Sequence, residues 1–356
     1  MKRILLLIDD LISGGAQRQI VGLAKLLHDE GYELKLIYYH PIEFYKQFLD
    51  DNCVDNECIA GASDSRQRIF RIASAISKYR PEVVISYLQV PSIIACLIKL
   101  FGQKYRLIVS ERNTTQILTA KERIKFFLMK WADEIVPNSY SQQHYIERNF
   151  PSLGQKVTTI TNFVDTDYFS PIEYEYRGNP RIVTVARVAE QKNVKSYIEA
   201  IRILKFRGYN FTIDWYGYTS ETYYAECMEL LKEYQLTEIF RFHKPTTSIL
   251  REYQCCDAFC LPSIYEGFPN VVCEAMSCGK PILCSNICDN PEIVDDGKNG
   301  FLFDPHNIDD MVDKIERFLL LEKVQKICMG ERSRELSLAK FSARTFLEKY
   351  KALIEK

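Results

Sequence analysis

Long apolar runs are missing from this sequence. A helix that crosses a bilayer needs about 20 apolar residues, and the nearest approach, VPSIIACLIKLF at 90–101, contains Lys99. The apolar start, MKRILLLIDDLISGG, is interrupted by Asp9 and Asp10, and a secretory signal core does not tolerate paired acids. We therefore expect no transmembrane helix, a buried first strand and a cytoplasmic location.

The sequence also lacks the spacing of a metal site. Its 12 cysteines include no C-x-x-C pair, and its five histidines do not cluster with them. Zinc sites pair their ligands at short, regular intervals. We predict that no metal is bound and that the cysteines act as small core residues in a reduced compartment.

Two nucleotide-binding fingerprints are absent as well. Neither G-x-G-x-x-G nor the P-loop pattern occurs, which removes the main support for hydride transfer and for P-loop phosphoryl transfer. The first expected strand is instead followed by DLISGGAQRQ, in which Gly14 and Gly15 precede a helix. Small residues there let a phosphate approach the helix N-terminus, but a tight turn that needs positive φ is an equally good explanation.

What the sequence does contain is a regular alternation of short apolar strands with amphipathic helices. With 356 residues, two domains are expected, and the alternation predicts parallel, doubly wound α/β sheets. Such folds bind ligands at the carboxyl ends of their strands, so we expect a cleft between two Rossmann-like domains. The expected strands are 3–8, 33–39, 82–87, 106–110, 134–138, 157–161, 181–186, 211–216, 239–242, 258–261, 281–284 and 301–303.

The alternation lapses once and then restarts. The segment NFVDTDYFSPIEYEYRGNP has no clear periodicity, which indicates a linker. We expect an N-terminal domain over 1–164, a linker over 165–178 and a C-terminal domain over 179–339. A C-terminal helix over about 340–356 is expected to pack back on the first domain.

Cations and carboxylates follow the expected strands of the second half. In VTVARVAEQKNV, Arg187 ends a strand and Lys192 precedes a helix. Two cations at this edge of the sheet could neutralise a diphosphate and stabilise it as a leaving group; the alternative is a pair of surface-loop cations. In YEGFPNVVCEAMSCGKP, Glu266 falls in a turn and Glu274 falls where a helix begins. Helix-terminus electrostatics explain Glu274 but not Glu266.

With these motifs the chain resembles the family 4 retaining glycosyltransferases of GT-B architecture. The resemblance covers nearly the whole chain and rests on the Gly-Gly turn, ARVAEQKN, the Glu-x7-Glu segment EGFPNVVCE and NPEIVDDGKNGFLF. It implies transfer of a sugar from a nucleotide diphosphate with retention at the anomeric carbon and without a bound metal or cofactor. The donor that it implies is a UDP-sugar.

The resemblance also implies roles for individual residues. Glu274 would hold the ribose hydroxyls, because one carboxylate can accept two hydrogen bonds from a diol. Glu266 would contact the transferred sugar, and Arg187 and Lys192 would grip the diphosphate. The implied catalytic residues are Glu266, Arg187 and Lys192, and the implied donor-binding residues are Gly14, Gly15, Arg187, Lys192, Glu266, Gly267, Phe268, Pro269, Asn270, Val271 and Glu274.

Two segments, DTD at 165–167 and SERN at 110–113, bear on metal binding and on the acceptor side. Residues 165–167 read DTD, the metal motif of a different glycosyltransferase class, but they fall in the expected linker, so we do not expect a metal there. Many relatives carry a histidine after the strand at 106–110, where this chain reads SERN. Arg112 and Asn113 are therefore candidates for the acceptor or sugar side.

One region is strongly basic although the net charge is −1. Residues 66–130 hold 13 lysines and arginines against three acids, a net of +10 that leaves −11 for the remainder. This asymmetry indicates an anionic partner, and no nucleic-acid-binding module is recognisable. On a helix expected over 121–132, the apolar residues of one face are assigned to the core, which turns the opposite face outward. We predict that this outward face contacts an anionic membrane surface; the alternative is a face that is simply solvated. The residues of the predicted contact are Arg123, Lys125, Phe126, Met129 and Lys130.

The leading hypothesis is a retaining glycosyltransferase that moves a hexose or N-acetylhexosamine from a UDP-sugar to a glycan acceptor. The acceptor is expected to be lipid-linked and the product a capsule, lipopolysaccharide or other surface polysaccharide, made on the inner face of the plasma membrane. A UDP-N-acetylglucosamine 2-epimerase shares the architecture but needs acids and histidines placed for proton transfer, and no such set is apparent. A third hypothesis, an inactive sugar-nucleotide-binding subunit, rests only on the missing histidine.

Overall fold

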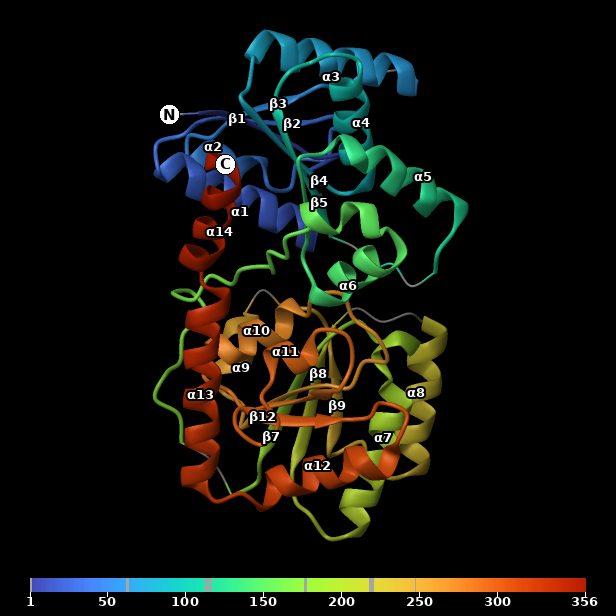
Figure 1. Ribbon diagram of the computed structural model, residues 1–356. Coiled ribbons are helices and arrows are strands. Elements are labelled where there is room, and N and C mark those ends of the chain that lie inside the picture. The colour runs from blue at the N-terminus through green and yellow to red at the C-terminus, as the bar shows by residue number, and fades with distance from the viewer. Residues whose placement is uncertain are drawn as a thin grey trace. The chain divides into compact units, whose positions relative to one another are not determined.

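The computed structural model describes residues 2–61, 64–112, 115, 117–175, 178–217, 221–246 and 248–356. The chain divides into two compact units (Figure 1). Unit 1 comprises Met1–Phe163 and Ala343–Lys356, and unit 2 comprises Val164–Ser342. Each unit has its own sheet with helices on both faces.

Unit 1 is built on a six-stranded parallel sheet with the order β3-β2-β1-β4-β5-β6. A parallel sheet covered on both faces has strands that are apolar throughout. In β1, Ile4 and Leu6 point into one core cluster, while Leu5 and Leu7 point into the other. The strands are β1 Arg3–Leu7, β2 Glu33–Tyr38, β3 Asp55–Cys58, β4 Val83–Tyr87, β5 Arg106–Glu111 and β6 Glu134–Pro137.

The helices of unit 1 divide between the two faces of this sheet. α1 and the C-terminal α14 lie side by side on the face of Ile4, and α3, α4 and α5 cover the face of Leu5 (Figure 1). The helices are α1 Gly15–Asp29, α2 Lys46–Asp51, α3 Ser65–Tyr79, α4 Gln89–Leu100, α5 Ala120–Leu128, the 3-10 helix η1 Met129–Trp131, α6 Tyr140–Asn149, the 3-10 helix η2 Pro151–Lys156 and α14 Ala343–Glu355.

Unit 2 repeats this topology. Its parallel sheet has the order β12-β11-β10-β7-β8-β9, so counted from its own first strand each sheet has the doubly wound order 3-2-1-4-5-6. The switch point, where the strand order changes direction, lies between β1 and β4 in unit 1 and between β7 and β10 in unit 2. The strands are β7 Arg181–Val185, β8 Thr212–Tyr216, β9 Phe240–His243, β10 Ala258–Leu261, β11 Ile282–Ser285 and β12 Gly300–Phe303.

The helices of unit 2 also form two layers. α7, α8 and α12 pack on the face that carries Trp215, and α9, α10 and α13 pack on the face that carries Phe259. The helices are the 3-10 helix η3 Glu190–Lys192, α7 Val194–Phe206, α8 Glu221–Glu233, α9 Ile249–Gln254, α10 Asn270–Ser277, α11 Asn290–Ile293, α12 Ile308–Leu320 and α13 Lys323–Phe341.

The prediction of two doubly wound parallel sheets is confirmed, with two errors of detail. Residues 157–161, all of which the structure describes, form no strand; Val157 makes only an isolated bridge with Ile135. β3 was not predicted, because its sequence DNEC is polar and its edge position leaves alternate residues exposed. An edge strand of this kind carries little of the apolar signal on which strand prediction depends.

Gly330 of α13 tests the packing of unit 2. An added Cβ would lie 2.3 Å from the backbone oxygen of Gly279, so Gly330→Ala should lower the free energy of unfolding by about 1–3 kcal/mol through overpacking. Helix propensity alone predicts the opposite, a gain of about 1 kcal/mol. Guanidinium unfolding followed by Trp215 fluorescence in a Trp131→Phe background reports on unit 2. Gly178→Ala, also in unit 2, is the control, because an added Cβ there would meet no atom within 4 Å. A stabilised Gly330→Ala protein would contradict the packing.

Candidate functional site

The loop after β7 carries the two cations that the sequence singled out. Arg187 is exposed, and within the described residues its guanidinium has no hydrogen-bond or ion-pair partner. Lys192 ends η3, and Asn193 then takes a positive φ of 56° before α7 begins. The Asn193 side chain donates to the backbone oxygen of Pro305 at 2.8 Å, which helps to hold this left-handed conformation. The loop that presents Lys192 is thus fixed at its end by the Asn193 side chain.

Lys192 meets Glu266 at the switch point of unit 2. Its Nζ lies 2.5 Å from Glu266 Oε1, and the Ser263 hydroxyl donates to the same oxygen at 2.5 Å. Glu266 is buried, at 8% exposure. A backbone bond from Ile264 to Gln191 joins the two loops. The adjacent strands β7 and β10 therefore bring together two oppositely charged groups that are 74 residues apart in sequence.

Glu274 lies in the second turn of α10 and is buried, at 5% exposure. The hydroxyl of Tyr253, on α9, donates to its Oε2 at 2.9 Å. Burying a carboxylate is costly unless it is hydrogen-bonded, so this tyrosine stabilises the position of Glu274. Sequence reasoning missed Tyr253, because nothing in the sequence indicates that α9 and α10 lie together.

The other expected donor-binding residues surround the start of α10. Phe268 and Pro269 are buried, and the Phe268 ring packs 5.6 Å from that of Phe341. Gly267, Asn270 and Val271 are half-buried. Since the Phe268 side chain belongs to the core, only its backbone is available to a ligand.

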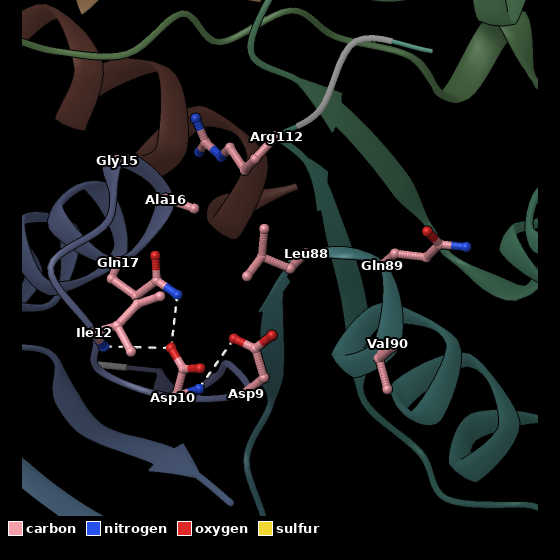
Figure 2. A pocket seen from close by; sticks show the side chains of 10 residues that line it. All are labelled: Asp9, Asp10, Ile12, Gly15, Ala16, Gln17, Leu88, Gln89, Val90 and Arg112. Atoms are coloured by element: carbon pink, nitrogen blue, oxygen red, sulfur yellow. Dashed lines mark hydrogen bonds between the residues drawn. The ribbon is translucent and has the colours of Figure 1, made fainter. Parts of the chain in front are cut away.

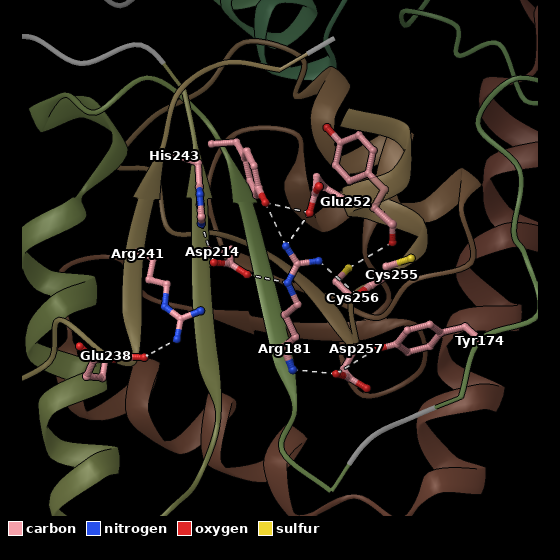
Figure 3. Close-up of polar contacts among 12 residues, drawn as sticks. Tyr174, Arg181, Asp214, Glu238, Arg241, His243, Glu252, Cys255, Cys256 and Asp257 are labelled. Atoms are coloured by element: carbon pink, nitrogen blue, oxygen red, sulfur yellow. Dashed lines mark hydrogen bonds and ion pairs between the residues drawn. The ribbon is translucent and has the colours of Figure 1, made fainter. Parts of the chain in front are cut away.

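A polar network under this site joins three strands to α9 (Figure 3). Arg181 donates to Asp214 Oδ2 and to Glu252 Oε2, each at 2.5 Å. Tyr216 donates to the same Glu252 oxygen at 2.8 Å, and its ring stacks on that of His243 at 4.5 Å. Glu252 immediately precedes Tyr253 on α9. The network therefore anchors the helix whose next residue holds Glu274.

Unit 1 has a cavity of about 530 Å³ at its own switch point (Figure 2). Residues after β1 and residues around the start of α4 line it. Sequence analysis noted Asp9 and Asp10 only as a break in the apolar run and assigned them no site role, although their place just after the first strand could have indicated it. Burial and the neighbouring Asp10 raise the pKa of Asp9. The lining residues are Asp9, Asp10, Ile12, Gly15, Ala16, Gln17, Leu88, Gln89, Val90 and Arg112.

Leu88 lines this cavity in a strained conformation. Its φ is 73° and its ψ is 165°, a combination that glycine adopts almost alone and that costs other residues roughly 1–3 kcal/mol. Strain of this size is concentrated at functional sites. The strained backbone at the carboxyl end of β4 therefore makes this cavity a candidate site.

The explanation of Gly14 and Gly15 by a positive-φ turn is wrong. Gly14 is the N-cap of α1 with an extended φ of −130°, and neither glycine has a positive φ. Gly15 lines the cavity just described. Close approach of a ligand to the start of α1 stays a prediction for this pair.

Arg112 is buried, and its guanidinium already forms hydrogen bonds within unit 1. Its guanidinium donates to Asn162 at 2.8 Å and to the Tyr350 hydroxyl at 2.9 Å, and it lies 4.1 Å from the centre of the Tyr87 ring. These contacts hold α14 to the sheet. Arg112 nevertheless lines the cavity, and its Nε has no hydrogen-bond partner among the described residues. Asn113, the other candidate on the acceptor side, lies outside the described residues.

Two family models match consecutive parts of the chain. "Glycosyltransferase Family 4" matches residues 13–168, and "Glycosyl transferases group 1" matches residues 168–335. The chain belongs to the family 4 glycosyltransferases. This confirms the resemblance, and the match favours a glycosyltransferase over the alternative epimerase.

Individual relatives agree with this assignment. This glycosyltransferase is 25% identical over 344 residues to the amylovoran biosynthesis glycosyltransferase AmsD of Erwinia amylovora. It is 24% identical over 350 residues to the Campylobacter jejuni enzyme N-acetylgalactosamine-N,N'-diacetylbacillosaminyl-diphospho-undecaprenol 4-alpha-N-acetylgalactosaminyltransferase. Each alignment covers 92% of both chains. The crystal structure of HepE from Anabaena in complex with UDP and glucose superposes with a TM-score of 0.83 at 16% identity over 100% of both chains, which confirms the GT-B fold.

The orientation predicted for the basic helix is wrong. Phe126 and Met129 are fully buried, and the Phe126 ring packs 4.4 Å from that of Phe150. Lys125 is also buried, because its ammonium pairs with two carboxylates, Glu111 and Glu122. The exposed face of α5 and η1 is the opposite one, with the apolar Ile124 and Phe127 beside the cations Lys121, Arg123 and Lys130.

The structure offers the described residues of this glycosyltransferase no obvious metal site: no three His, Cys, Asp or Glu side chains among them are grouped as metal ligands would be. In the DTD segment, Asp165 instead accepts backbone bonds from Asp167 and Tyr168. All 12 cysteines are free thiols, and most are buried. None of the helices described combines the length and the apolar character that a membrane crossing requires.

The network in Figure 3 gives a pH-dependent prediction. Burial raises the pKa of Asp214, but hydrogen bonds from Arg181 and His243 outweigh it, so the pKa lies below the ordinary value of 3.8. The stabilisation is therefore present above that value and is lost as the pH falls through the folded-state pKa. Asp214→Asn should cost about 3 kcal/mol at pH 7 and progressively less below pH 3.8.

Chemical unfolding of both proteins at pH 7 and near pH 3 measures this difference. Asp313→Asn is the control, because Asp313 forms an exposed ion pair with Arg317, and such pairs contribute about 0–1 kcal/mol. A cost for Asp214→Asn that is equally large at both pH values would contradict the assigned pKa direction.

Proposed function

We propose that this glycosyltransferase moves a hexose or N-acetylhexosamine from a UDP-sugar to a lipid-linked glycan, with retention of anomeric configuration, in the biosynthesis of a surface polysaccharide. The observation that carries the proposal is the convergence of Lys192, Ser263 and Glu266 at the switch point of unit 2. The Campylobacter relative, named for a diphospho-undecaprenol acceptor, and the Anabaena structure, solved with UDP and glucose, support the substrate classes.

In this proposal unit 2 binds the donor. Arg187, exposed and unpaired among the described residues, is available to a diphosphate, and Glu274, held by Tyr253, accepts hydrogen bonds from the ribose hydroxyls. As the bond from the anomeric carbon to the phosphate oxygen breaks, negative charge grows on the departing UDP. Arg187 and Lys192 stabilise that charge, which lowers the barrier. The acceptor hydroxyl then forms the new bond and gives its proton to the departing phosphate, so no metal and no protein nucleophile is required.

Unit 1 binds the acceptor in this proposal. Its cavity of about 530 Å³ at the switch point, with Asp9 and Asp10 on one side and Gln89 on the other, supports this role. Carboxylates and amides are suitable partners for sugar hydroxyls.

Substitutions that remove a single charge from the donor site should distinguish residues that bind UDP from residues that act in turnover. Glu274→Gln should weaken UDP binding by about 10-fold to 100-fold, the value of a charged hydrogen bond. Glu266→Gln should lower turnover with little change in UDP affinity, and Arg187→Ala should lower both. Calorimetric titration with UDP and UDP release from a panel of UDP-hexoses and UDP-N-acetylhexosamines measure these effects.

Lys205→Ala, which removes an exposed cation of α7, is the matched control and should change neither quantity. The proposal fails if Glu266→Gln and Arg187→Ala leave binding and turnover at the level of Lys205→Ala. Epimerised sugar in the product would favour the alternative enzyme class, and UDP binding without turnover of any donor would favour an inactive subunit.

We also propose that the exposed face of α5 and η1 contacts an anionic membrane surface. Ile124 and Phe127 are more than half exposed beside the cations Lys121, Arg123 and Lys130, and apolar side chains ringed by cations suit such a surface. The double variant Ile124→Ser/Phe127→Ser should reduce sedimentation with phosphatidylglycerol vesicles about tenfold, since each side chain buries apolar area there.

Phe206→Ser controls for the loss of an exposed aromatic residue, because Phe206 is 91% exposed on α7 of unit 2. It should sediment as the wild type does. If the double variant also sediments as the wild type does, or if neutral phosphatidylcholine vesicles are bound equally well, this face is not a membrane contact.

A further inference from the structure

A second, smaller cavity of about 280 Å³ lies beside the first in unit 1 and shares Gln89 and Arg112 with it. It is formed where β5 ends and α5 begins, and its polar lining includes Glu111, Thr115, Glu122 and Lys125. Its volume is just below the roughly 300 Å³ at which ligand pockets begin. The cavity is therefore of a size for a single sugar ring.

The wall of this cavity contains two buried charged groups, Lys125 and Glu111, and a half-buried one, Glu122. Lys125 Nζ lies 2.8 Å from Glu111 Oε2 and 2.6 Å from Glu122 Oε2, and the side chains of Lys125 and Glu111 are only 3% and 4% exposed. Burying such ions costs several kcal/mol each, and an apolar replacement of similar volume is often as stable. Stability of the fold alone is thus a weak reason for this arrangement.

Two polar atoms of the wall remain unsatisfied. Glu111 Oε1 and Arg112 Nε are both buried and have no hydrogen-bond partner among the described residues. One is an acceptor and the other is a donor, and they belong to adjacent residues that line the same cavity. Leaving such groups unpaired costs about 1–3 kcal/mol each, whereas a hydroxyl group both donates and accepts. The wall of this cavity therefore contains polar side chains that the described part of the fold leaves incompletely paired.

The charges of the wall indicate which ligand fits. Glu111 and Glu122 are balanced by Lys125 and Arg112, so the cavity has no excess charge to attract a phosphate or a carboxylate. Burial raises the pKa of Glu111, although Lys125 opposes this. A neutral polyol is the chemical class that this wall recognises.

We infer that this cavity binds the terminal sugar ring of the acceptor, with the hydroxyls of the ring hydrogen-bonded by polar side chains of the wall, Glu111 among them. This inference rests on the proposed function, because it takes the acceptor to be a glycan. It gives Glu111 and Lys125 a role in acceptor recognition that the sequence did not indicate. Gln89 and Arg112, which line both cavities, join this subsite to the larger one at the switch point.

Saturation-transfer NMR on the full chain tests the inference, with the methyl glycosides of glucose, galactose, N-acetylglucosamine and N-acetylgalactosamine as probes in the presence of UDP. At least one glycoside should bind the wild type, and Glu111→Gln should weaken it at least tenfold, as expected for a lost charged hydrogen bond. The double variant Glu111→Gln/Lys125→Met removes the buried charges at nearly constant volume and should show the same loss even if the single variant is unstable.

Glu134→Gln is the matched control. Glu134 is another buried carboxylate of unit 1, paired with Arg106 at 2.8 Å, and it does not line the cavity. The Glu134→Gln variant should bind the glycoside as the wild type does, even if its free energy of unfolding is lower. Binding that persists in the double variant, or no binding of any glycoside to a wild type that binds UDP normally, overturns the subsite. A wild type that binds no UDP would instead count against the proposed function itself.

Discussion

A parallel sheet that is covered on both faces leaves only the ends of its strands for polar chemistry. Both sheets of this glycosyltransferase obey that constraint, and both have the same doubly wound order, so each has one switch point at which two loops diverge. In unit 1 these loops carry Asp9, Asp10 and Gln89, and in unit 2 they carry Lys192 and Glu266. The position of the candidate site in each unit therefore follows from topology before any particular side chain is considered.

The two units hold their polar groups in different ways. In unit 2, the carboxylates of Glu266 and Glu274 are buried and hydrogen-bonded by Ser263, Lys192 and Tyr253, so a ligand would meet groups that are already oriented, which reduces the entropic cost of binding. In unit 1, polar atoms of Glu111 and Arg112 are buried without partners in the described part of the chain, and strain is stored at Leu88. The carboxylates of unit 2 therefore already have hydrogen-bond partners, whereas unit 1 retains buried polar atoms without partners among the described residues.

Sequence patterns predicted most of the fold, because apolar runs bounded by helical periodicity are local signals. They also placed Arg187, Lys192 and Glu266 correctly at strand ends. They failed where the orientation or the partner of a side chain depends on contacts between segments that are distant in sequence. The helix at 121–132 has two apolar stripes, and which one is buried depends on Phe150, from a later segment, and on Glu111, which draws Lys125 inward. Tyr253 could not be paired with Glu274 for the same reason, since only the packing of α9 beside α10 joins them.

The most direct test of the account is a crystal structure of the full chain with UDP and with an intact UDP-sugar. The account predicts that the ribose hydroxyls lie within about 3.2 Å of the Glu274 carboxylate, that the diphosphate contacts Arg187 and Lys192, and that the sugar lies against Glu266. Nucleotide bound elsewhere on unit 2, or bound with its ribose away from Glu274 and its diphosphate away from both cations, would contradict it.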